Sequence, residues 1–99
     1  MSTELERAIG RVVEGTRHWS PARWLPHADT MHGLVQALAD IAADAEGRER
    51  RPVPRLPNDM SLPDQLQVVG VDLIELEPLD SSQVKAADEA IAAARSDLF

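Results

Sequence analysis

The chain has 99 residues, which is the length of one domain, and its 17 acidic against 10 basic side chains give a net charge of −7. This sign argues against nucleic acid and against anionic membrane surfaces, because both require a basic footprint. The absence of cysteine excludes disulfides, thiolate metal sites and a cysteine nucleophile.

The N-terminus is acidic and amphipathic, and no apolar run approaches the ~20 residues that span a bilayer. We therefore expect no signal peptide and no membrane helix, and assign the chain to the cytoplasm by default. Arginine and alanine are abundant while Lys85 is the single lysine, which suggests a GC-rich bacterial genome.

The first predicted helix covers residues 4–18. Thr3 and Glu6 have the spacing of a capping box, which satisfies free N–H groups at a helix start. Apolar side chains then recur at helical spacing at Leu5, Ile9, Val12, Thr16 and Trp19.

A short turn should follow this helix. Ser20 and Pro21 resemble a new N-cap and first helical position, and Pro26 ends the turn quickly. The turn should place Trp19 and Trp24 near each other.

Two interpretations of these tryptophans remain open. With Arg17 and Arg23 beside them, Trp19 and Trp24 have the composition of a binding hot spot, and a guanidinium over an indole would add cation–π attraction. Alternatively, both indoles close the end of an aliphatic core, which is the interpretation we favour.

A second long helix should run from residue 30 to residue 46, capped by Asp29 or Thr30 and ended by Gly47 in the left-handed conformation. Its predicted core side chains are Met31, Leu34, Val35, Leu38, Ile41, Ala42 and Ala45.

Residues 48–59 contain four arginines and three prolines, which favour an extended, polyproline-like path. We expect an ordered crossover whose arginines neutralise Asp40, Asp44 or Asp64. The spacing of Arg51, Pro54 and Pro57 also matches peptides that dock into aromatic grooves, but such a short pattern arises easily by chance.

The central element is a predicted helix over residues 62–76, with Ser61 as N-cap and Pro63 in the first turn. Its core spacing is Leu62, Leu66, Val69, Leu73 and Leu76. Residues 69–76 also alternate well enough for a strand, but the helical register is longer and has start and stop signals.

A second apolar strip marks this helix. Val68 and Val71 fall opposite its core stripe, with Ile74 nearby. A helix that is apolar on two sides is either sandwiched or docked against a partner. We therefore predict an interface at Val68, Val71 and Ile74, with Trp24 and Trp19 as further candidates.

The last predicted helix begins at Asp80 or Ser81 and ends near residue 96. Its inward side chains should be Val84, Ala87, Ile91, Ala94 and Leu98. The segment LDSSQV, residues 79–84, resembles the aspartate-serine-leucine turn of acyl carrier proteins over a few residues. However, Ser82 stands where an apolar residue is expected and only one helix follows, so we interpret the segment as helix capping.

No catalytic constellation is present. His18, His27 and His32 lie close in sequence, but their spacing fits no helical ligand pair, so they are a weak metal candidate. No strained nucleophile turn, phosphate loop or apolar carboxylate pair occurs. We therefore predict no enzyme, no cofactor and no resident metal.

Taken together, the chain (residues 1–99) is predicted to be one all-α domain, a small four-helix bundle with a proline-rich crossover between the second and third long helices. The expected role is a non-catalytic accessory, regulatory or neutralising subunit that binds a protein partner or forms a dimer. The alternative is a small-ligand or metal-binding protein that uses the Trp/His region.

Overall fold

The computed structural model describes residues 3–76 and 78–99, and this part of the chain contains helices and no strand. The helices are α1 (Thr3–Thr16), α2 (Pro21–Trp24), α3 (Ala28–Glu46), α4 (Leu62–Glu75) and α5 (Ser81–Leu98), with a 3₁₀ turn, η1, at Asp59–Ser61. The all-α class is therefore confirmed, and residues 69–75 are helical rather than a strand. Among the described residues, no helix combines the length and apolarity needed to cross a membrane.

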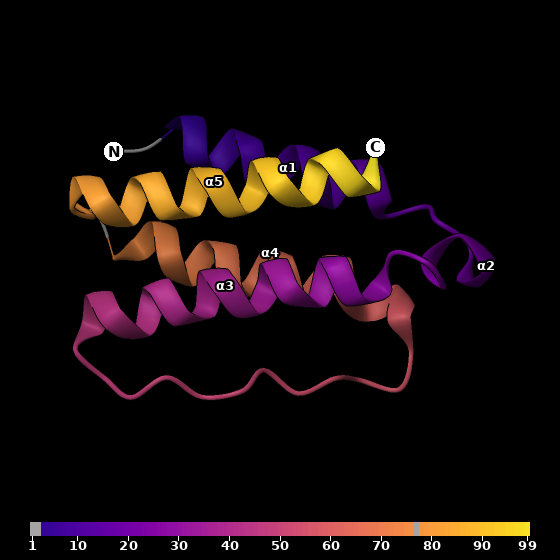
Figure 1. The fold of residues 1–99 in the computed structure, drawn as a ribbon, viewed down its shortest axis with the longest axis horizontal. Helices are drawn as coiled ribbons and strands as arrows, with labels where there is room; N and C mark the ends of the chain where they lie inside the picture. Colours follow the sequence, from indigo (N-terminus) through magenta and orange to yellow (C-terminus); the bar gives the residue numbers. More distant parts are fainter. Residues whose placement is uncertain (1–2, 77) are drawn as a thin grey trace.

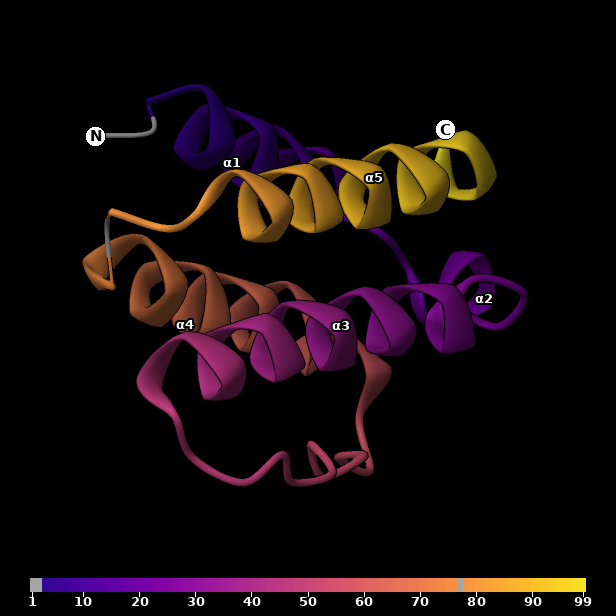
Figure 2. The same cartoon turned by 60° about the vertical axis from the view of Figure 1, so that its left-hand side comes forward.

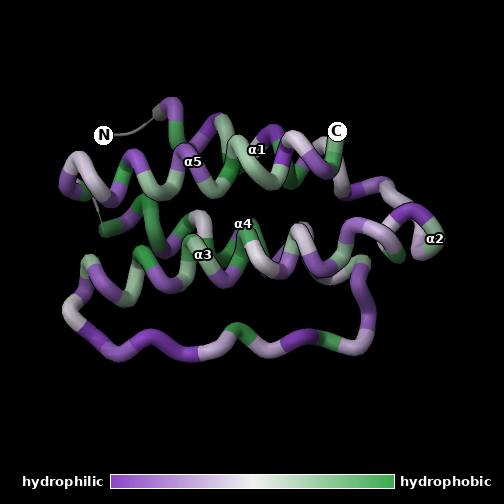
Figure 3. Tube along the Cα trace, viewed as in Figure 1, coloured by the Kyte–Doolittle hydropathy of each residue, from purple (hydrophilic) through white to green (hydrophobic). Residues whose placement is uncertain are grey.

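The four long helices enclose one core. Helix α3 packs against α4 and α5, and α1 packs against the same two helices from the other side (Figure 1). Helices α3 and α4 run in the same direction, so the chain between them must return along the full length of α3 (Figures 1 and 2). Residues 48–58 make this return as an extended segment, which we call the strap, and Figure 3 shows that it is mostly hydrophilic.

The core consists of the apolar stripes of the long helices, closed at one end by the two tryptophans. All five positions of the predicted stripe are buried, together with Val13, although α1 ends at Thr16 and Trp19 lies beyond it. On α3, the predicted Ala45 is exposed and Ile41 is half-buried, whereas Ala43 is buried. On α4, Leu62, Leu66 and Leu73 are buried.

The structure confirms the predicted end of α3 and the predicted start of α5. Gly47 ends α3 with φ of 70°, and Asp80 forms a capping box with Gln83 at the start of α5. Asp80 accepts from the Gln83 backbone N–H at 2.8 Å, which, with the Ser82 hydroxyl, lowers the pKa of Asp80. The capping box predicted at residue 3 rests on a side chain outside the described part of the structure.

Of two predicted N-caps, Ser61 stands at the N-cap position of α4 but its side chain makes no capping hydrogen bond, and the cap predicted for α3 at Asp29 or Thr30 is wrong. Ser61 is already helical (φ −81°, ψ −11°) because Asn58 caps the preceding 3₁₀ turn, so the Ser61 hydroxyl donates to the Asn58 carbonyl at 2.6 Å. Helix α3 begins at Ala28, ahead of Asp29 and Thr30, with His27 as N-cap. The α2 turn leads directly into α3 through the His27 N–H, which donates to the Trp24 carbonyl at 2.9 Å.

Candidate interaction surface

The outer face of α4 exposes two valines side by side. Val68 is 61% exposed and Val71 is 44% exposed, although both lie in a helix whose other face fills the core. They are three positions apart and therefore neighbours on the helix surface. With the exposed carboxylates Asp64, Asp72 and Glu75 they form what we call the α4 ridge.

One side of the α4 ridge borders a groove between α1 and α4. This hollow of about 310 Å³ is lined by Glu6, Ile9, Gly10, Gln67, Gly70, Val71, Ile74 and Glu75. Gly70 lets the two helices approach closely at its base, because a Cβ there would lie 2.8 Å from Cγ2 of Ile9. We call this hollow the α1–α4 groove.

The other side of the α4 ridge borders the strap. Val68 and Val69 line a second hollow, of about 410 Å³, together with Val53 and Leu56 of the strap. Leu56 is 40% exposed, whereas Val53 is half-buried against the core. Apolar surface thus continues from the strap across the α4 ridge to the α1–α4 groove.

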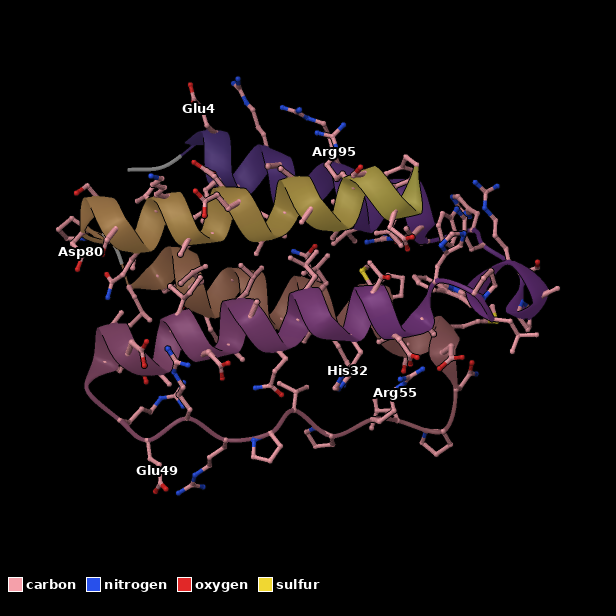
Figure 4. All side chains as sticks on the ribbon, viewed as in Figure 1. Glu4, His32, Glu49, Arg55, Asp80 and Arg95 are labelled. Carbon is pink, nitrogen blue, oxygen red and sulfur yellow. The ribbon has the colours of Figure 1, made fainter. Side chains whose placement is uncertain are left out.

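The strap is held to α3 and α4 by side chains that bind its backbone. Gln36 accepts from the Val53 N–H at 2.7 Å and donates to the Arg51 carbonyl at 3.1 Å. His32, which points from α3 to the strap in Figure 4, lies 2.9 Å from the Val53 carbonyl through Nε2. Gln65 of α4 donates to the Pro54 carbonyl at 3.0 Å.

The strap arginines form ion pairs on the α3 side. Arg50 makes two hydrogen bonds to Asp44, at 2.6 and 3.0 Å, and these bonds hold the pKa of Asp44 below its ordinary value. Arg55 bridges Asp29 at 2.8 Å and Asp59 at 3.2 Å (Figure 4). The prediction that strap arginines neutralise α3 acids is thus confirmed for Asp44, and Arg50 also lies 4.0 Å from a carboxylate oxygen of Asp40.

The acids of the α4 ridge have no such partners. Helix α4 contains no lysine or arginine. Asp64, Asp72 and Glu75 form no ion pair with any residue in the described ranges, and the same holds for Glu6 across the α1–α4 groove. The predicted pairing of Asp64 with an arginine is therefore absent from the described structure. Among the described residues, the acids of α3 therefore lie beside strap arginines, whereas the acids of the α4 ridge do not.

The two tryptophans lie inside the protein. Trp24 is 0% and Trp19 is 5% exposed, and their rings are 4.9 Å apart, so neither indole offers a contact surface in this structure. The guanidinium of Arg23 lies 4.4 Å from the Trp19 ring centre, as expected for a cation–π contact. This geometry matches the interpretation in which both indoles close the end of the core.

The three histidines are dispersed. His18 is exposed, His27 lies 3.2 Å from a carboxylate oxygen of Asp97, and His32 holds the strap. The pKa of Asp97 is lowered, first by a hydrogen bond from Thr30 and then by His27. No group of three or more potential metal ligands occurs within the described residues.

Of the three residues that the sequence singles out on α4, Val71 and Ile74 line the α1–α4 groove and Val68 lines the hollow beside the strap, but the groove's other wall was not predicted from the sequence. That wall comes from α1, and its contribution includes Gly10 and Glu6. Gly10 was a visible signal, since a glycine inside a helix needs an explanation.

Comparison with known proteins identifies no relative. No protein-family model matches the chain, and no curated protein or solved structure matches it significantly.

Proposed function

We propose that this chain is a small four-helix bundle that serves as a non-catalytic accessory, regulatory or neutralising subunit, and that it contacts its partner protein through the α4 ridge. The observation that carries the proposal is the adjacent exposure of Val68 and Val71 on a helix whose opposite face already supplies the core. A single exposed valine is ordinary, but two neighbours between two apolar hollows make a continuous surface.

The gain from covering this surface is appreciable. At about 25 cal/mol per Å² of apolar area, covering the exposed parts of Val68 and Val71 contributes roughly 1–2 kcal/mol each. The half-buried Ile74 and the exposed Leu56 extend the area on either side. The unpaired carboxylates around the valines would direct a partner of opposite charge.

The test compares three tagged chains used to capture partners from the native cell, with quantitative mass spectrometry of the bound proteins. The wild type and the control Ala92→Asp should enrich the same protein, whereas Val68→Asp/Val71→Asp should lose about tenfold or more of it. Ala92 is an exposed residue of α5, so Ala92→Asp adds an aspartate to a helix surface away from α4.

The thermal unfolding of all three chains should be measured alongside the capture, to show that each chain is folded. All three positions are exposed, so these substitutions should change the free energy of unfolding by only about 0.5 kcal/mol each. Equal capture by all three chains, with each one folded, would show that the α4 ridge is not the contact surface.

A further inference from the structure

Gly10 stands in the middle of α1 at the α1–α4 groove, and nothing within the described fold requires a glycine there. A Cβ at Gly10 would meet no atom within 4 Å. Its backbone is ordinary, since Gly47 is the residue with positive φ among those described. Glycine at an interior helix position is less favourable than alanine, so the chain gives up stability at this point.

Two other glycines show why Gly10 alone would not indicate a site. Gly70 is explained internally, because a Cβ there would collide with Ile9. Gly33 on α3 is also open, and it faces a hollow lined with alanines. Gly10 differs from Gly33 because its hollow is bordered by the exposed Val71 and the half-buried Ile74.

The charge of the groove identifies the sign of its occupant. Glu6 on α1 and Glu75 on α4 both line the hollow, and no lysine or arginine does. A symmetric contact with a second copy would bring these carboxylates near their own counterparts, which is unfavourable. A segment with lysines or arginines beside its apolar side chains would pair with them instead.

The polar groups of the groove identify the conformation of its occupant. The strap shows what an extended segment needs on this protein, since Gln36, His32 and Gln65 all bind its backbone. Among the lining side chains of the α1–α4 groove, Gln67 alone can both donate to and accept from a backbone, whereas Glu6 and Glu75 can only accept. An extended chain there would leave backbone N–H and C=O groups unpaired against an apolar floor, whereas a helix satisfies its own.

Resting on the proposed function, we infer that the α1–α4 groove seats a basic amphipathic helix of a partner protein, with Gly10 as the point of closest approach. The apolar stripe of that helix lies over Val71 and Ile74. Its basic flanks pair with Glu6 and Glu75. This is the helix-in-groove mode of recognition, in which side chains three and four residues apart act as anchors.

The probe is a fluorescently labelled synthetic helix of about 18 residues with leucines at i, i+3, i+4 and i+7 spacing and lysines on both flanks. A matched peptide carries glutamate in place of every lysine. Binding to the full chain is measured by fluorescence anisotropy at low and at moderate salt. We expect the lysine peptide to bind, to weaken as salt screens the rim charges, and to be favoured over the glutamate peptide.

Two sets of variants locate the binding. Gly10→Leu fills the α1–α4 groove and should weaken the lysine peptide by about tenfold or more, whereas the control Gly33→Leu, at the other open helix glycine, should leave its affinity unchanged. Glu6→Lys/Glu75→Lys should shift the preference toward the glutamate peptide. Both leucine variants keep the helical fold, because each replaces an open glycine by a better helix former.

Several results would overturn the inference. These are absence of binding by the lysine peptide, equal binding by Gly10→Leu and the wild type, or an unchanged preference after the charge reversal. A dimer in sedimentation that Gly10→Leu dissociates would assign the groove to a second copy. If Val68→Asp/Val71→Asp loses the cellular partner while Gly10→Leu keeps it, the α4 ridge stands as the contact surface and the groove inference fails alone.

Discussion

The same substitution at the two glycines of the α1–α4 groove should change stability in opposite directions. Gly10→Ala adds a Cβ into open space, so it should stabilise the fold by about 0.5–1 kcal/mol through helix propensity and a less flexible unfolded chain. Gly70→Ala brings the same gain in propensity but adds its Cβ where α4 packs directly on Ile9 of α1.

The magnitude at Gly70 follows from the side chain that the new methyl group meets. Its Cβ would lie 2.8 Å from Cγ2 and 3.3 Å from Cδ1 of Ile9, which is 5% exposed. Cγ2 is bonded directly to the Ile9 Cβ, so it moves away only through a new rotamer or a shift of the helix. Overpacking of this kind costs about 1–3 kcal/mol, which leaves a net destabilisation of up to about 2 kcal/mol.

Denaturant unfolding and thermal unfolding both measure the difference. For a chain of this size, 1 kcal/mol corresponds to about 4–8 °C in Tm, so the two variants should lie on opposite sides of the wild type by an easily measured margin. Ile9→Ala should be less destabilising in the Gly70→Ala background than alone, because it removes the clashing atom. If Gly70→Ala stabilises as much as Gly10→Ala, α1 and α4 are not packed this closely.

Three further variants test other contacts. Gln36→Ala should destabilise the fold by about 1–2 kcal/mol and speed hydrogen exchange at the Val53 N–H, whereas Gln36→Glu keeps an acceptor for that group and should preserve its protection. Asp80 has a lowered pKa in the folded state, so its contribution to stability is present at neutral pH and is lost as the pH falls through that lowered pKa. Asp80→Asn should therefore make unfolding less dependent on acid, which acid titration followed by circular dichroism would measure. Arg23→Ala should destabilise by about 0.5–1 kcal/mol and change the fluorescence of Trp19, and unchanged emission would argue against the cation–π contact.

The helices and most of the core could be predicted because both depend on local periodicity. Each side chain of the stripe in α1 is buried where its spacing places it, including Thr16, whose hydroxyl donates to the Val12 carbonyl at 2.8 Å. The core stripe also decided correctly between helix and strand for residues 69–75, since it held over four turns.

The exact helix starts were harder to predict because other turns precede them. Ser61 has the right residue type for an N-cap, but η1 makes the chain helical before Ser61 is reached. Asp29 fails for a similar reason, because α2 already turns the chain into α3. Residue type alone does not reveal that a neighbouring turn has occupied the capping role.

Only the α4 side of the candidate surface could be predicted from the sequence. Val68 and Val71 stand out in the sequence of α4 by their position opposite its leucines. The contact between Gly70 and Ile9 joins residues far apart in the chain, so the groove could not be derived from either helix alone. The tryptophans were ambiguous because composition does not distinguish a buried aromatic pair from an exposed one.

The strap explains why the two sides of the bundle differ. Because α3 and α4 are parallel, the chain must return along α3, and its arginines can then reach the α3 acids, as Arg50 reaches Asp44. The strap also borders one side of the α4 ridge, but the ion pairs of its arginines go to Asp29, Asp40, Asp44, Glu46 and Asp59, so the acids of the α4 ridge have no cation partner among the described residues. The strap covers α3 in two ways. It packs the apolar side chain of Val53 against the core, and it supplies arginines that pair with the carboxylates of α3. The partner that we propose for the α4 ridge would supply the same two features, an apolar side chain and cations, from another molecule.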